Sequence, residues 1–125
     1  MEELAVARAT EAITGCRQVG SNAEISVCYG KILNELKVEV QQAQNRRKKD
    51  LSVLSPKNSG GSRNVLRFQR AARDLDIHWN AIIALECGPL IEAEFYGAQG
   101  QGLFAKLCQI NIVAARLDSL TAARR

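Results

Sequence analysis

The sequence predicts an all-α protein, an antiparallel bundle of about four helices cross-linked by two disulfides. Two observations predict the helices: apolar residues recur three and four positions apart along four segments, and only two prolines interrupt the 125 residues. The third observation is that the four cysteines form two pairs, each placed evenly about a turn. The length predicts one domain, residues 1–125, with enough chain to bury a core without a metal.

The first two predicted helices lie on either side of a break at residues 18–22. Within the break Gly20 can adopt a positive φ. Ser21 and Glu24 then fit a capping box, in which the serine oxygen accepts a backbone N–H and the glutamate reaches back to the cap. Each helix carries small and apolar residues on one face. These residues are Ala5, Ala9, Ala12, Ile13 and Cys16 in the first helix, and Ile25, Cys28, Ile32, Leu36, Val40 and Ala43 in the second.

A mobile basic loop is predicted around residues 46–62. Apolar residues stop at QNRRKKD, and the serine-rich LSVLSPKNSGGS that follows contains Pro56, Gly60 and Gly61. A long third helix is expected to begin near Ser62, a residue suited to the N-cap. Its apolar residues alternate three and four positions apart, which favours helix–helix packing. They are Val65, Phe68, Ala72, Leu75, Trp79 and Ile82.

Gly88 and Pro89 are expected to kink or interrupt this helix, because proline lacks the N–H and disfavours helix before it. The glycine-rich GAQGQG then predicts a turn. No segment convincingly predicts a strand, and no internal repeat is present. The last helix repeats the three-four spacing with Leu103, Leu107, Ile110, Ala114 and Leu117.

The four cysteines, Cys16, Cys28, Cys87 and Cys108, favour disulfides over a metal site or a catalytic thiol. They lack the paired spacing of zinc ligands, and His78 is the only histidine. Because His78 and Cys87 lie on different sides of one predicted helix, the two side chains cannot meet. We therefore expect no metal site, no cofactor and no catalytic residue.

The predicted turns pair the cysteines. Cys16 and Cys28 are centred on residue 22, and Cys87 and Cys108 are centred within the glycine-rich turn. In an antiparallel hairpin, residues equidistant from the turn lie at the same height, as a disulfide requires. Of the three possible connectivities we prefer 16–28 with 87–108, each contributing about 3 kcal/mol. Four buried free thiols remain the alternative.

Disulfides predict an oxidising compartment. No apolar run is long enough for a membrane span, and the N-terminal MEELAVARATEAITGC lacks the basic start and continuous apolar middle of a signal peptide. We therefore expect a periplasmic or secreted protein whose signal peptide has been removed. With free thiols, the same N-terminus would indicate a cytosolic protein.

Positive charge is concentrated between residues 46 and 73, although the net charge of the whole chain is only +4. Asp50 and Asp74 are the acids in or beside this stretch. Such a patch attracts anions, and a solvated helix face with a mobile loop is the alternative interpretation. The basic residues are Arg46, Arg47, Lys48, Lys49, Lys57, Arg63, Arg67, Arg70 and Arg73.

Several elements of the chain resemble the LprI-type lysozyme-inhibitor domain family of small secreted bacterial proteins. That family shows two cysteines about a dozen residues apart near the N-terminus, and a tryptophan eight residues before a third cysteine. A glycine-rich turn follows, then a fourth cysteine with an arginine and a leucine after it. The matching elements are Cys16, Cys28, Trp79, Cys87, the turn at 96–100, Cys108, Arg116 and Leu120.

The resemblance implies an all-helical, disulfide-linked bacterial protein of the periplasm or the extracellular space. The chain departs from the family where a glutamine before the tryptophan and an Arg–Asp pair before the third cysteine are expected. Asp76, Ile83 and Ala84 occupy those positions here. Trp79 lies on the apolar stripe and is expected in the core. Arg116 is expected to brace a carboxylate of a neighbouring helix.

These observations favour a binding protein over an enzyme. The first hypothesis is an inhibitor or immunity-type protein that acts on lysozyme or another peptidoglycan hydrolase, with the basic loop pairing with the carboxylates of the cleft. The alternative is a surface module that binds lipopolysaccharide, anionic lipid or another polyanion through residues 46–73. Nucleic acid is disfavoured by the oxidising compartment and because the only aromatic residue among the charges, Phe68, is assigned to the helix-packing stripe. The expected binding residues are Arg46, Arg47, Lys48, Lys49, Lys57, Arg63, Arg67 and Arg70.

Overall fold

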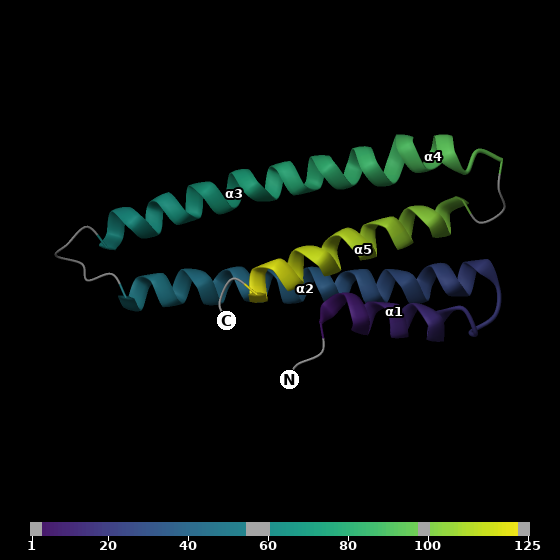
Figure 1. Cartoon of the computed structure of the whole chain (residues 1–125), viewed down its shortest axis with the longest axis horizontal. Coiled ribbons are helices and arrows are strands. Elements are labelled where there is room, and N and C mark those ends of the chain that lie inside the picture. The colour runs from purple at the N-terminus through teal and green to yellow at the C-terminus, as the bar shows by residue number, and fades with distance from the viewer. Residues whose placement is uncertain (1–3, 55–60, 98–100, 123–125) are drawn as a thin grey trace.

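The structure is a computed structural model, and it describes residues 4–54, 61–97 and 101–122. It confirms an all-α antiparallel bundle with two disulfides, and no strand occurs within those ranges. Figure 1 shows the long helices side by side. In chain order the elements are α1 (Ala5–Cys16), α2 (Asn22–Leu54), α3 (Gly61–Leu85), the π-helical turn η2 (Glu86–Leu90), α4 (Ile91–Glu94) and α5 (Gln101–Ala122).

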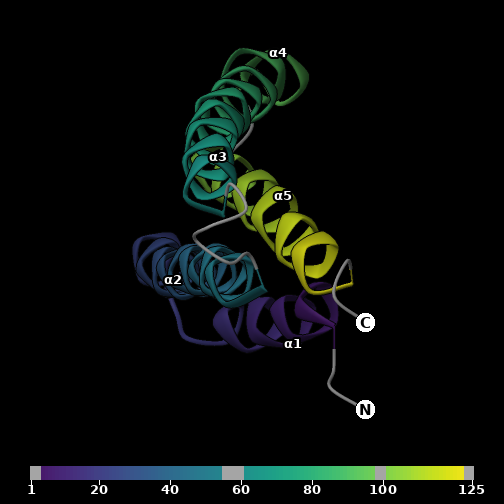
Figure 2. The same cartoon turned by 90° about the vertical axis from the view of Figure 1, so that its left-hand side faces the viewer.

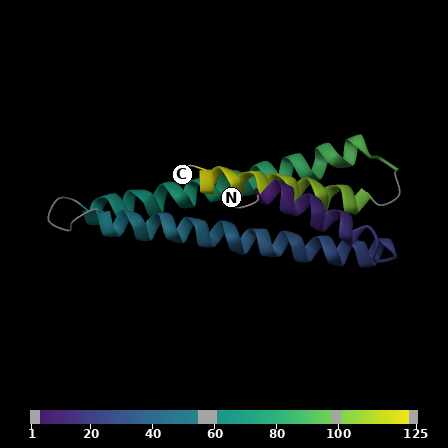
Figure 3. The same cartoon turned by 60° about the horizontal axis from the view of Figure 1, so that its bottom comes forward.

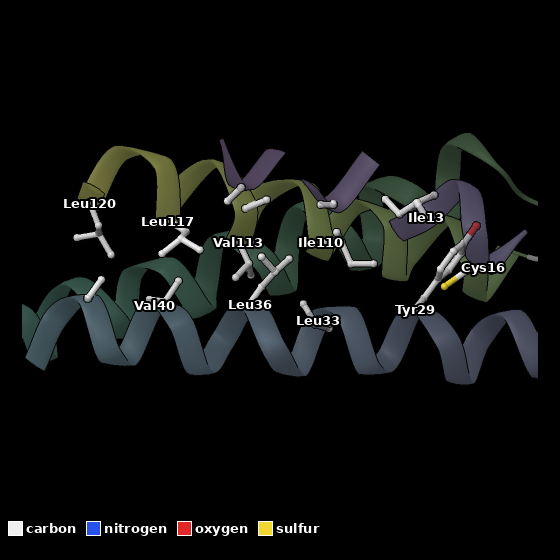
Figure 4. Packing of buried hydrophobic residues seen from close by; sticks show 14 residues of the cluster. Ile13, Cys16, Tyr29, Leu33, Leu36, Val40, Ile110, Val113, Leu117 and Leu120 are labelled. Carbon is white, nitrogen blue, oxygen red and sulfur yellow. The ribbon is translucent and has the colours of Figure 1, made fainter. Parts of the chain in front are cut away.

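The buried core is shared by α1, α2 and α5 (Figure 4). The predicted face of α1 supplies it, except that Ala12 is exposed, and α5 buries the predicted Ile110, Ala114 and Leu117. Leu103 and Leu107 are half-buried against the core, whereas Val113 and Leu120 are buried outside the predicted spacing. α2 contacts both other helices, so it needs a wider apolar face than the predicted stripe and buries Tyr29 and Leu33 as well. The core residues are Ala5, Ala9, Ile13 and Cys16 of α1, Tyr29, Leu33, Leu36, Val40 and Ala43 of α2, and Ile110, Val113, Ala114, Leu117 and Leu120 of α5.

α3 lies outside this core, on the side of α2 and α5 opposite to α1 (Figure 2). None of its side chains that the structure describes is fully buried. Its inner face is half-buried instead, and only Ile83 of this face packs directly against the core cluster. The half-buried residues that repeat along the inner face are Val65, Phe68, Ala72, Asp76, Trp79 and Ile83.

The predicted inner face of α3 is wrong in its second half. Leu75 and Ile82 are 40% and 48% exposed, and Asp76 and Ile83 point inward in their place. The predicted pattern repeats every 3.5 residues, which keeps one face inward only in a supercoiled helix. The half-buried residues from Val65 to Ile83 instead follow the 3.6-residue period of a straight α-helix, because 18 residues make about five turns.

The basic segment is helical where a loop was predicted. α2 continues through residues 46–54, and α3 begins at Gly61, so the two helices extend together past the C-terminal end of α5 (Figures 1 and 3). Arginine, lysine and leucine have high helix propensity, and no glycine or proline occurs from Arg46 to Ser55. The helix therefore persists after its apolar stripe has ended. Lys57 lies outside the described residues.

The break between α1 and α2 is built largely as predicted. Gly20 has φ 134°, a value that side-chain-bearing residues avoid. Ser21 Oγ accepts the backbone N–H of Glu24 at 3.3 Å. The glutamate contact differs from the predicted capping box, because the Ser21 hydroxyl donates to Glu24 Oε1 at 3.3 Å.

The predicted interruption at Gly88 and Pro89 is a π-helical turn. Pro89 cannot donate a backbone hydrogen bond, and its ring would clash with a carbonyl of the preceding α-helical turn. Widening the turn over Glu86–Leu90 accommodates the ring and lets the helix continue into α4. Cys87 is buried within this turn. Because Cys87 is bonded to Cys108 of α5, the position of this turn determines where the end of α3 is linked to α5.

Candidate functional site

Two disulfides use all four cysteines of the chain. Cys16 is bonded to Cys28 and Cys87 to Cys108, with Cα–Cα distances of 5.6 and 5.5 Å, as the turn positions predicted. No thiol is left for catalysis or metal binding. Functional chemistry must therefore come from other side chains, of which the basic residues form the largest group.

The basic residues come together on what we term the basic arm, residues 46–54 of α2 and 61–73 of α3. The arm is the part of these two helices that lies toward and beyond the C-terminal end of α5 (Figure 1). It holds eight basic side chains and one acid, Asp50, for a net charge of 8 − 1 = +7. The basic residues are Arg46, Arg47, Lys48 and Lys49 of α2 and Arg63, Arg67, Arg70 and Arg73 of α3.

Arg47 holds the two helices of the arm together. Its guanidinium lies 5.4 Å from the centre of the Phe68 ring, a cation–π contact between α2 and α3. Its Nη1 donates to Gln44 Oε1 at 3.4 Å. Gln44 is buried where the apolar core of α2 ends. Arg47 is thus half-buried and engaged within the protein, a role different from the ligand contact that the sequence predicted.

The other predicted binding residues lie at the surface of the arm. Arg46, Lys49 and the four arginines of α3 are exposed, and Lys48 is half-buried. From Arg63 to Arg73 the α3 arginines extend over roughly 15 Å of helix. Because these charges project from two neighbouring helices, the arm offers an extended cationic surface, suited to a partner with many negative charges.

Arg116, Trp79 and Leu120 have structural positions. Arg116 of α5 forms an ion pair with Asp76 of α3, as a brace between helices was predicted. Its guanidinium also lies 5.5 Å from the centre of the Trp79 ring. Trp79 is therefore half-buried between α3 and α5, outside the buried core that the sequence predicted for it. Leu120 lies in the core.

Some contacts that position the helices were missed by sequence reasoning. Lys106 of α5 donates to the backbone oxygen and the hydroxyl of Ser26 on α2, at 3.0 and 2.8 Å. Asp118 of α5 accepts two backbone N–H groups at the start of α1. The partners of these residues are 80 or more positions away in the chain, so no local pattern could have revealed them.

No family model, curated protein or solved structure matches the chain. The resemblance in cysteine, tryptophan and arginine spacing therefore stays a prediction. Among the described helices, none is both long and apolar enough to cross a membrane. The disulfides themselves are typical of proteins from oxidising compartments.

Proposed function

We propose that this chain is a non-catalytic binding protein of the periplasm or the extracellular space, and that its basic arm binds an anionic surface. Anionic lipid headgroups and lipopolysaccharide are the surfaces that we favour. The observation that supports this most directly is the charge of the arm, +7 on two adjacent helices with one acid among them. Most of those charges are exposed.

The shape of the arm favours a broad partner over a narrow cleft. Two helices side by side are roughly 20 Å across, because each is about 10 Å wide with its side chains. Each lysine or arginine held near an anionic bilayer contributes about 1 kcal/mol, and this attraction decays over a Debye length of about 8 Å at physiological salt. Binding should therefore be strong in dilute buffer and weak in concentrated salt.

Vesicle binding with a charge-matched control tests the proposal. Arg63, Arg67 and Arg70 are changed together to glutamine, which removes three charges from the arm. The control changes three exposed basic residues to glutamine: Arg17, in the turn between α1 and α2, and Lys31 and Lys37 of α2. The arm variant is expected to bind phosphatidylglycerol vesicles roughly 100-fold more weakly than the wild type at low salt, from about 1 kcal/mol per charge.

The control is expected to lose much less affinity, although its net charge is the same as that of the arm variant. Equal losses for the two variants would mean that net charge, not the arm, governs binding. Equal binding of the wild type to neutral phosphatidylcholine and to phosphatidylglycerol vesicles would contradict the proposal altogether.

Inhibition of a peptidoglycan hydrolase is the second candidate function. It is supported by the resemblance over residues 16–120 and by the projection of the arm past α5 (Figure 3). Paired carboxylates in a glycosidase cleft would attract the arm, whereas a basic lysozyme would repel it at long range. Lytic assays on a panel of lysozymes and amidases test this function. Unchanged hydrolysis with the wild-type protein would exclude it for the enzymes in the panel.

A further inference from the structure

α3 carries a second apolar stripe that none of the described helices covers. We term it the outer stripe: the apolar residues Ala71, Leu75, Ile82 and Leu85 with His78 at its centre, spaced alternately four and three residues apart. At about 100° of rotation per residue, the outer stripe lies roughly 100° around the helix from the inner face. Leu75, Ile82 and Leu85 are 40%, 48% and 64% exposed. This four-three spacing is that of a helix–helix seam.

Basic and acidic residues lie in separate halves of the segment formed by α3, η2 and α4. Residues 61–73 contain four arginines and no acid, whereas residues 74–94 contain five acids and neither lysine nor arginine. One of these acids, Asp76, already pairs with Arg116. The segment is therefore positive along its first half and negative along its second. An antiparallel copy of the same segment would present the opposite order of charge.

We propose that the outer stripe is a homodimer interface, in which α3 packs antiparallel against α3 of a second copy about a two-fold axis near His78. In this arrangement the apolar residues of one stripe face those of the other, and each basic half lies beside an acidic half of the partner. A parallel pair would instead place like charges together. A two-fold axis also uses the same surface on both copies, as most homodimers do.

The charge pattern selects a second copy over a lipid surface as the occupant of the outer stripe. An interfacial helix on anionic lipid combines an apolar face with a predominantly basic polar face. Only the first half of α3 has that character, and the acids at 74–94 would be repelled along the rest. The dimer also leaves Arg70 and Arg73 accessible, because they lie about 100° or more around α3 from the outer stripe.

Sedimentation equilibrium with two matched isoleucine variants tests the interface. Ile82→Glu places a charge in the outer stripe, whereas Ile77→Glu places the same charge about 140° away on the same helix. Both isoleucines are exposed, at 48% and 60%, so neither change disturbs the core. The wild type is expected to show a concentration-dependent dimer. Ile82→Glu should raise the dissociation constant of the dimer roughly 100-fold or more, because each dimer loses two apolar contacts and gains two buried charges. Ile77→Glu should change this constant little.

Cross-linking tests the antiparallel orientation. The native cysteines are all in disulfides, so new thiols can be labelled selectively. Ala71→Cys and Leu85→Cys proteins are mixed and treated with a short bis-maleimide. An antiparallel dimer brings residue 71 of one copy near residue 85 of the other, and heterodimeric cross-links should dominate. A parallel dimer would separate these positions by about 21 Å and yield mainly homodimeric links.

Three outcomes would overturn the inference. They are a monomer at every concentration, equal weakening by both glutamate variants, and a monomer whose binding to anionic vesicles is abolished by Ile82→Glu but not by Ile77→Glu. The last outcome would show that the outer stripe contacts lipid. Since none of these measurements changes a basic residue of the arm, dimerisation can fail while the proposed function of the arm stands, and the converse also holds.

Discussion

Arg116 joins α5 to α3 through an ion pair with Asp76 and a cation–π contact with Trp79. Its side chain is only 11% exposed, so its aliphatic part also covers apolar surface. This matters because α3 shares so little of the buried core. Arg116 is therefore one of the contacts that attach α3 to the bundle, together with Arg47 on Phe68 and the Cys87–Cys108 disulfide.

Arg116→Ala is expected to lower the free energy of unfolding by about 1–2 kcal/mol, the sum of a modest ion pair, a cation–π contact and lost packing. Urea unfolding followed by circular dichroism measures this loss. Trp79 is the only tryptophan, so its fluorescence reports the contact directly. Arg17→Ala, at an exposed position, is the control and should change neither quantity. Equal effects of the two variants would show that the Arg116 contacts contribute nothing specific.

At the scale of the element, α1 begins with a cap supplied by another helix. Leu4 at the N-cap offers no side-chain hydrogen bond. The carboxylate of Asp118 on α5 accepts instead from the backbone N–H groups of Ala5 and Val6, at 2.6 and 3.0 Å. Its negative charge also interacts favourably with the N-terminal end of the helix dipole. The same carboxylate therefore caps α1 and positions it against α5.

Asp118→Ala is expected to destabilise the protein by about 1–2 kcal/mol, through loss of the cap and of the helix-dipole interaction. Amide hydrogen exchange measures the effect and should show the largest loss of protection in α1. Asp118→Asn retains an acceptor oxygen without the charge, so its loss should be smaller. Asp74→Ala, an exposed carboxylate of α3, is the matched control. Protection lost evenly over all helices would argue against a local capping role.

The bounds and buried residues of a helix could be predicted from the sequence only to the extent that the helix packs along a single apolar face. α1 and α5 pack on the core along one face, and their apolar spacing predicted most of their buried residues, although not Val113 and Leu120. α2 outlasts its apolar stripe because helix propensity alone extends it to Leu54, which a search for apolar periodicity cannot detect. For α3, two apolar seams share one helix, and the sequence alone could not tell that Leu75 and Ile82 belong to the outer one.

The candidate site was predicted in its composition but not in its shape. Charge counting located the basic segment, whose role as a binding site stays a prediction, and turn positions identified the disulfides. The contact of Arg47 with Phe68 depends on the register between α2 and α3, which follows from tertiary packing. Helix propensity makes the predicted loop helical up to Leu54, and the register places Arg47 against Phe68, a contact within the protein that charge counting could not predict.

At the scale of the whole molecule, the two ends of the bundle are built differently. Cys16 is the last residue of α1, and its partner lies near the start of α2. Cys87 lies in η2, and its partner lies in the second turn of α5. Both disulfides are thus near the end of the bundle that holds α4, and the basic arm is at the other (Figure 1). The helices of the arm are held together by contacts such as Arg47 on Phe68, and neither disulfide lies between them.

This division predicts unequal effects of the two disulfides. In the loop-entropy model, either one contributes about 3 kcal/mol, because the closed loops are of similar length. Removing Cys16–Cys28 loosens α1 from α2 inside the core, so protection should fall throughout α1, α2 and α5. Removing Cys87–Cys108 releases the α3, η2 and α4 segment, which buries few residues of its own. That segment should then open separately while the three-helix core stays closed.

Native-state hydrogen exchange on the Cys87→Ser/Cys108→Ser and Cys16→Ser/Cys28→Ser variants distinguishes these effects. In the first variant, residues 61–94 are expected to exchange through opening of this segment alone, with a weaker urea dependence than global unfolding. Residues 29–43 and 110–120 should retain an exchange rate that follows global unfolding. In the second variant all three segments should follow the lowered global stability. Equal exchange of residues 61–94 and the core in both variants would contradict this prediction. It would show that α3 unfolds with the core as one cooperative unit.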